Sequence, residues 1–110
     1  MSISTTRYFR SDVVRMTGRV DTYTSAELQK TLDELAAEGR HNIVFDMSEV
    51  DFLSSKGLHV LTETQIKAKN HGGKLLLVNP NEKIRESFEW VGMVDYFEIF
   101  DDVTRAVGSF

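Results

Sequence analysis

Cysteine is absent from this chain of 110 residues, and its absence removes several kinds of chemistry. Without a thiol there is no disulfide, no thiolate metal site and no cysteine nucleophile. No apolar run approaches the roughly 18 residues of a membrane-spanning helix. No signal peptide is visible at the start of the sequence. We therefore expect a cytoplasmic protein without membrane insertion.

Clusters of basic residues are also missing. The formal net charge is −4, and the lysines and arginines are scattered rather than gathered in a stripe. Nucleic-acid binding normally needs such a stripe, so we expect no direct contact with nucleic acid. The length and the hydrophobic fraction of 41% suit a single domain over residues 1–110 with one core.

Motifs typical of enzymes are scarce. No Gly-x-Ser-x-Gly elbow holds a serine nucleophile, and no glycine-rich loop leads from a strand into a helix to cradle a phosphate. His41, His59 and His71 show no metal-ligand spacing with one another or with carboxylates. We therefore expect no cofactor, no metal and no catalysis. A small enzyme that uses Asp21 and Asp46 at strand ends is the least favoured alternative.

What the chain does contain is a series of short apolar runs typical of strands. The predicted strands are residues 3–9 (the weakest), 13–17 ended by Gly18, 43–45, 75–78 and 96–100. The runs at 43–45 and 75–78 are continuously apolar, which is typical of strands buried on both faces. The first two strands are expected to pair side by side.

Amphipathic segments between these runs predict four helices. The first starts at a capping-box pattern over residues 24–27 and stops near Gly39, and the second runs from about Ser55 to Asn70. A third ends at Gly92, with Ile84, Phe88 and Val91 on one face, and Asp101 caps a short final helix. This alternation predicts an α/β fold with a mostly parallel central sheet, an N-terminal antiparallel edge strand and helices packed against it.

The segment from Asp46 to Leu58 carries the strongest functional signal. Asp46 is expected to end a strand, and Ser54 and Ser55 follow where the next helix begins. In parallel α/β sheets functional groups gather beyond the carboxyl ends of the strands. A helix N-terminus also favours negative charge. A phosphate would add about −1.5 to −2 charge there, which favours a switch over a catalytic site.

The neighbours of these serines suggest how such a switch would act. The strand-end rule also brings Asp21 towards the serines. A phosphate on Ser55 would then be repelled by Asp21 and Asp46, with Lys56 a partial offset, and would act mainly by spoiling a partner's contact. The structural alternative stays open: a serine here can simply be the helix N-cap, with Gly57 permitting close packing.

Three apolar side chains have no obvious place in the predicted helices. Val60 and Ile66 fall away from the apolar stripe of the second helix. They either touch the margins of the sheet or, if exposed, form an apolar contact surface beside Ser55. Trp90 is interpreted as core or edge packing rather than as a platform for a ligand.

The chain resembles the STAS domain of the bacterial anti-sigma factor antagonist family over nearly its whole length. Residues 18–21 (Gly-Arg-Val-Asp) resemble the family's Gly-Glu-Leu-Asp turn, and residues 24–28 resemble the helix that follows it. Residues 46–58 are similar to the family's phosphorylation segment, and residues 88–93 to the end of its penultimate helix. Two positions depart from the pattern: Ser54 stands where Asp is usual, and Arg19 where an acidic residue is common.

The resemblance implies a mechanism and a set of partners. The family's acceptor serine stands two residues before a Gly-Leu pair, a place that Ser55 occupies, with Ser54 the second candidate. An anti-sigma factor with serine-kinase activity would phosphorylate it using ATP held by the kinase. The unphosphorylated protein would bind that kinase and free a sigma factor, and a serine phosphatase would reset it. The residues expected to contact the partner are Asp21, Ser54, Ser55, Lys56, Gly57 and Val60.

The departures at Ser54 and Arg19 motivate an alternative within the same family. A constitutive STAS adaptor, such as a subunit of a signalling scaffold or of a lipid-transport complex, would bind its partner without a phosphorylation step.

Overall fold

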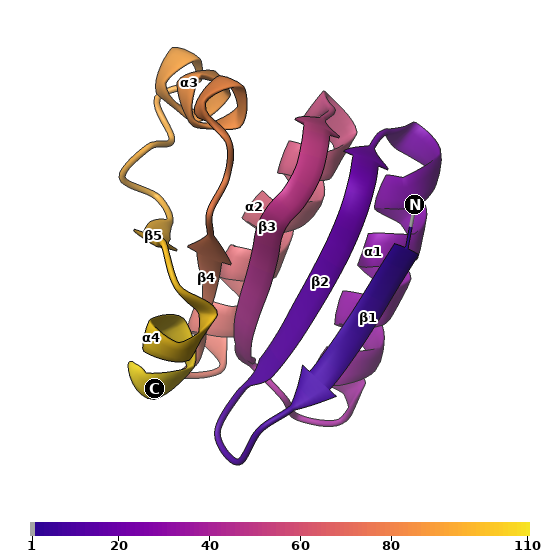
Figure 1. Ribbon diagram of the computed structural model, residues 1–110. Coiled ribbons are helices and arrows are strands. Elements are labelled where there is room, and N and C mark those ends of the chain that lie inside the picture. The colour runs from indigo at the N-terminus through magenta and orange to yellow at the C-terminus, as the bar shows by residue number, and fades with distance from the viewer. Residues whose placement is uncertain (1) are drawn as a thin grey trace.

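The computed structural model describes residues 2–110 as a five-stranded sheet with helices on both faces (Figure 1). The strands are β1 (Ser2–Arg7), β2 (Asp12–Val20), β3 (Asn42–Leu53), β4 (Lys74–Val78) and β5 (Glu98–Phe100). The helices are α1 (Thr22–Ala37), α2 (Ser55–Asn70), α3 (Glu82–Trp90) and α4 (Val103–Gly108). The strands lie in sequence order, with β1 antiparallel to β2 and the other pairs parallel. The predicted fold class is confirmed.

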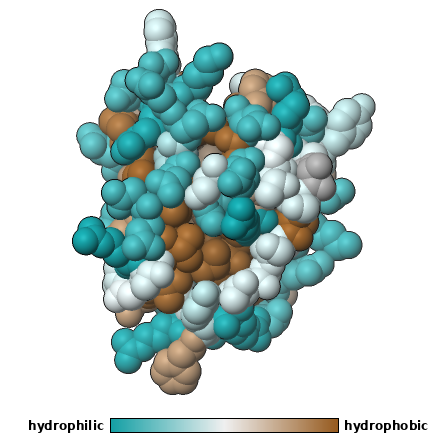
Figure 2. Space-filling view, in the orientation of Figure 1, coloured by the Kyte–Doolittle hydropathy of each residue, from teal (hydrophilic) through white to brown (hydrophobic). Residues whose placement is uncertain are grey.

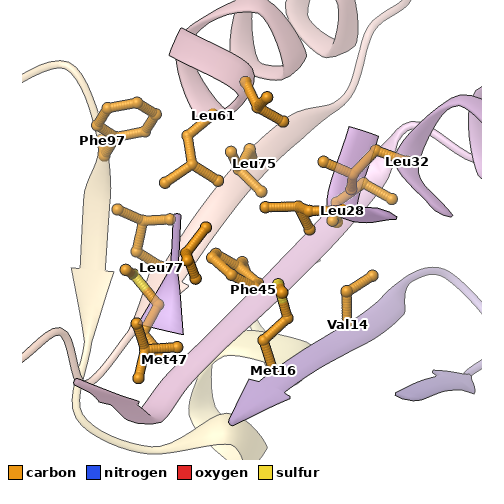
Figure 3. Close-up of a cluster of buried hydrophobic side chains, with 14 of the residues drawn as sticks. Val14, Met16, Leu28, Leu32, Phe45, Met47, Leu61, Leu75, Leu77 and Phe97 are labelled. Atoms are coloured by element: carbon orange, nitrogen blue, oxygen red, sulfur yellow. The ribbon is translucent and has the colours of Figure 1, made fainter. Parts of the chain in front are cut away.

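Two apolar clusters attach the helices to the sheet. The larger one joins Phe45 of β3 to Leu28 of α1 and Leu61 of α2, all fully buried (Figure 3). The smaller one, on the opposite face, joins Val44 to Ala106 of α4. Because residues 43–45 of β3 and residues 75–78 of β4 are covered on both faces, these two runs are continuously apolar. The short α4 covers only part of its face, where hydrophobic side chains gather in a hollow (Figure 2).

The strand β3 is much longer than the predicted run at 43–45, and this overturns the predicted place of Asp46. Beyond Asp46 the strand β4 has ended, and β3 continues along β2 alone as far as Leu53. Only one face of this extension meets the core, so its sequence turns polar. Asp46 is therefore buried in the middle of β3 and accepts hydrogen bonds from the Ser48 backbone N–H (3.0 Å) and hydroxyl (2.6 Å).

The junction between β2 and α1 also differs from the prediction. The strand does not end at Gly18, whose φ is 89°; it passes through an irregularity in the pairing with β3 and continues to Val20. The helix then begins at Thr22 with Asp21 as its N-cap, rather than at the pattern over residues 24–27. Asp21 takes this role because its carboxylate reaches the first-turn amides, while Thr24 supplies the other half of the capping box.

The C-terminal elements are shorter than expected. The strand β5 begins at Glu98 rather than at residue 96, and Asp102, not Asp101, caps α4. The helix α3 ends at Trp90, so Val91 lies beyond its apolar face and is 55% exposed. Trp90 is 86% exposed, so its interpretation as core or edge packing is wrong.

The extent of α2 agrees with the prediction, but its buried face does not. Val60 belongs to the core, with 1% of its surface exposed, whereas Ile66 is 44% exposed. Gln65 is also buried, and its side chain accepts a hydrogen bond from the Leu75 N–H (2.8 Å) and donates one to the Leu75 carbonyl (3.1 Å). A polar residue thus fixes α2 to β4, which is why the apolar stripe looked irregular in the sequence.

Candidate functional site

The junctions β2–α1 and β3–α2 lie side by side at the carboxyl ends of the parallel strands, at the top of Figure 1. Val20 and Leu53, the last residues of β2 and β3, are paired, and the Ser54 N–H donates to the Val20 carbonyl at 2.8 Å. Asp21 follows Val20 directly. The prediction that Asp21 comes close to the serine pair is therefore confirmed. Asp46 lies eight residues from Ser54 along an extended strand, at roughly 3.3 Å per residue, and does not belong to this site.

Ser54 is the N-cap of α2. Its backbone is extended, and its hydroxyl oxygen accepts the Gly57 N–H at 3.0 Å. A short side-chain acceptor at this position satisfies one of the amides that the first helical turn leaves unpaired. The hydroxyl of Ser54 is thus engaged and only partly exposed.

Ser55 is the first residue of α2 and is exposed to solvent. Within residues 2–110 its hydroxyl has no hydrogen-bond partner. Lys56 beside it is also exposed. The two neighbouring serines, equivalent in the sequence, therefore have different roles: one caps the helix and the other presents a free hydroxyl beside the cap.

Gly57 is needed for the close approach of α2 to β2 and β3. A Cβ at this position would lie 2.6 Å from Leu53 Cδ1 and 2.9 Å from Val20 Cγ1. Both distances are shorter than van der Waals contact, so a larger residue would force the Leu53 and Val20 side chains to shift or push the start of α2 outward. Gly57 is buried, and its packing against the strand ends positions the start of α2 and so Ser55.

The carboxylate of Asp21 is committed to α1. It accepts the backbone N–H groups of Thr24 and Tyr23, each at 3.0 Å. The hydrogen bond from the Thr24 amide, aided by the Thr24 hydroxyl and by Arg19, lowers the pKa of Asp21 below its ordinary value. Asp21 is therefore negatively charged at neutral pH, close to the start of α2.

Sequence reasoning missed an aromatic group next to this junction. The Arg19 guanidinium lies 4.2 Å from the ring centre of Phe52, which is 39% exposed, and Tyr23 is 85% exposed. Exposed aromatic rings and arginine are enriched in protein interfaces. The available signal was the position of Arg19 and Phe52 within the two strand ends, but their pairing depends on the register between β2 and β3.

Val60 does not contribute to this surface. The prediction that it contacts a partner required an exposed side chain, and its burial makes that prediction wrong. It lies on the core side because α2 packs over β3 and α1 along a wider face than the stripe of leucines indicated.

Residues 2–110 contain no cluster of three or more histidine, aspartate or glutamate side chains able to hold a metal ion. Nor does any helix in this range have the length and apolar character needed to cross a membrane. A groove of about 410 Å³ lies between α1 and α2, lined by residues that include Leu32, Asp33 and Lys67. None of Asp21, Ser54 and Ser55 lines it.

These features define a class: a small α/β domain with an exposed serine at a helix start. The chain belongs to the STAS domain family, whose model matches residues 4–106. It is 30% identical over 87 residues to the anti-sigma-B factor antagonist of Staphylococcus epidermidis, covering 78% of this chain and 80% of that protein.

Solved structures show the same fold. An anti-sigma factor antagonist from Mycobacterium paratuberculosis superposes with a TM-score of 0.86 at 23% identity, covering 98% of this chain and 92% of the other. The Bacillus cell fate determinant SpoIIAA in its phosphorylated form gives a TM-score of 0.80 at 16% identity, covering 98% of each chain.

Proposed function

We propose that this protein is an anti-sigma factor antagonist of the cytoplasm whose binding to an anti-sigma factor serine kinase is switched by phosphorylation of Ser55. In the unphosphorylated form it binds the kinase and thereby releases a sigma factor, and a serine phosphatase restores this form. The observation that carries the proposal is the exposed Ser55 hydroxyl at the start of α2, in a STAS domain with an anti-sigma-B factor antagonist among its relatives.

The geometry favours Ser55 over Ser54 as the acceptor. A kinase has to reach the hydroxyl oxygen, and that of Ser54 is occupied by the Gly57 N–H. A phosphate on Ser54 would also replace the cap of α2, whereas one on Ser55 leaves the cap in place. The preference for Ser55 over Ser54 as the phosphate acceptor, first implied by the family resemblance, thus has independent support from the hydrogen bonding.

The phosphate would change the charge of the contact surface more than the fold. Asp21 is the negative neighbour that remains after Asp46 is excluded, and Lys56 is the adjacent cation. An exposed phosphate at a helix N-terminus is compatible with the helix dipole, so the domain stays folded. Binding is lost because a partner surface built for a neutral hydroxyl would have to bury about two negative charges.

The test incubates the protein with its cognate anti-sigma serine kinase and ATP and then maps the modified residue by mass spectrometry. We expect phosphate on Ser55 in the wild-type protein and in Ser54→Asp, because aspartate preserves the cap. Ser55→Ala should bind the kinase but resist modification, and Ser55→Asp should bind at least about tenfold more weakly, a loss of about 1.4 kcal/mol. An unmodified Ser55 next to an active kinase would overturn the proposal.

A constitutive STAS adaptor remains the second candidate because Ser54 replaces the usual aspartate and Arg19 stacks on Phe52 at the same surface. This function predicts recovery of a transport ATPase or a scaffold protein in a pull-down. It also predicts that Ser55→Asp leaves that recovery unchanged.

A further inference from the structure

Three large apolar side chains are exposed at the end of α3 and just beyond it. Trp90 is 86% exposed, Val91 55% and Val94 38%. Grouped apolar side chains on a surface indicate a contact site more strongly than isolated ones do. Tryptophan is among the residues that most often carry the binding energy of an interface. We call Trp90, Val91 and Val94 the apolar shelf.

The shelf is attached to buried structure and does not hang from a free loop. Phe88, at the end of the same helix, is fully buried, and its carbonyl accepts the Met93 N–H at 2.7 Å. At the other end of α3, the Asn81 side chain donates to the Val50 carbonyl of β3 at 3.3 Å. A pre-ordered surface of this kind loses little conformational entropy when a partner binds.

The shelf adjoins the helix that carries Ser55. Met93, which lies within the shelf segment, places its sulfur 3.9 Å from the Thr62 hydroxyl of α2. Thr62 is seven residues from Ser55, roughly 10 Å along the helix at 1.5 Å per residue. One side of a standard protein interface covers about 800 Å², which is wide enough to include both features. Figure 1 shows α3 at the same end of the sheet as the start of α2.

We propose that the apolar shelf is a second contact for the same anti-sigma kinase that acts on Ser55; this inference rests on the proposed function. The facing surface of the kinase would be apolar opposite Trp90 and basic at its margin, because exposed Glu89 and Asp95 flank the shelf. The shelf supplies affinity in both phosphorylation states, and Ser55 supplies the switch.

The experiment measures the dissociation constant for the kinase with Trp90→Ala and with Phe9→Ala as a matched control. Phe9 is 91% exposed and lies in the turn between β1 and β2, at the opposite end of the sheet (Figure 1). We expect Trp90→Ala to weaken binding at least about tenfold, as truncation of a central interface tryptophan does, and Phe9→Ala to leave it unchanged. In a Ser55→Asp background, Trp90→Ala should weaken binding by a similar factor, because separate sites add.

A second readout needs no loss-of-function variant. Trp90 is the only tryptophan of the chain, so its fluorescence reports on the shelf alone. Bound kinase should protect Trp90 from acrylamide quenching, with Trp90→Phe supplying the background from the kinase. Circular dichroism and urea denaturation should show that Trp90→Ala is folded and as stable as the wild-type protein, since the side chain is exposed.

The outcomes separate the two proposals. If Trp90→Ala binds like the wild-type protein while Ser55→Asp still weakens binding, the shelf is no contact and the switch stands. If the wild-type protein does not bind the kinase at all, both proposals fail. If Trp90→Ala instead converts a self-associated protein into a monomer in sedimentation, the shelf binds a second copy of the chain, which overturns the inference.

Discussion

At the scale of single residues, the proposed switch depends on the different hydrogen bonding of two adjacent serines. Ser54 uses its hydroxyl to accept the Gly57 amide, and this leaves the Ser55 hydroxyl free at the surface. Asp21 performs the same capping task for the neighbouring helix. Both helix starts at this end are thus fixed by short polar side chains, and the charge of Asp21 is a by-product of its structural role.

Substitution can separate the capping role of Asp21 from its negative charge. Asp21→Asn preserves an acceptor for the α1 amides but removes the charge, whereas Asp21→Ala removes both. We expect Asp21→Ala to lower the free energy of unfolding by about 1 kcal/mol and Asp21→Asn to change it little. Urea denaturation at neutral pH measures both. Equal losses in the two variants would show that the charge, not the cap, stabilises this junction.

At the scale of elements, the start of α2 is positioned by contact with two strand ends. Gly57 lies against Leu53 of β3 and Val20 of β2 with no space for a methyl group. The helix therefore begins at the sheet itself, which sets how far Ser55 projects. The same closeness explains why Val60, about one turn on, is part of the core.

Substitution of Gly57 by alanine sets two effects on stability against each other. Alanine favours a helix more than glycine does, but its methyl group would crowd this junction. We expect Gly57→Ala to destabilise the protein by about 1–3 kcal/mol because the methyl group overpacks the junction. At Gly108, the last residue of α4, no atom beyond its chain neighbours and its own helix backbone lies within 4 Å of the place that a methyl group would take. Gly108→Ala should therefore be neutral or stabilising by up to about 1 kcal/mol. Urea denaturation of both variants gives the comparison, and a neutral Gly57→Ala would refute the close approach.

At the scale of the whole molecule, the two ends of the sheet have different characters. The carboxyl ends of the parallel strands carry Asp21, the two serines Ser54 and Ser55, and α3. The opposite end carries the turn between β1 and β2, where Arg40 forms an ion pair with the buried Asp12 at 2.6 Å. His41 and His71 stack there, with ring centres 4.2 Å apart. Stability can therefore also be altered at an end of the sheet that lies away from the proposed switch.

We expect the histidine pair to make the stability of the fold depend on pH. Burial, followed by the nearby His71 and Lys67, lowers the pKa of His41. The unfolded chain therefore binds a proton more readily than the folded one, and stability should fall as pH drops through about 6.5, the ordinary value for histidine. The urea midpoint should be lower at pH 5.5 than at pH 7.5, and His41→Asn should reduce the difference. An undiminished difference in that variant would assign the effect to other groups.

The fold class, the extent of α2 and the serine pair at its start could be predicted from residue order alone, because apolar periodicity and capping chemistry are local properties. Other features required the packed molecule. The length of β3 depends on where its neighbour β4 ends, and that removed Asp46 from the site. The burial of Val60 and Gln65 depends on what α2 packs against. The difference between Ser54 and Ser55 arises only when one hydroxyl meets the Gly57 amide, a matter of backbone geometry that residue types alone do not specify.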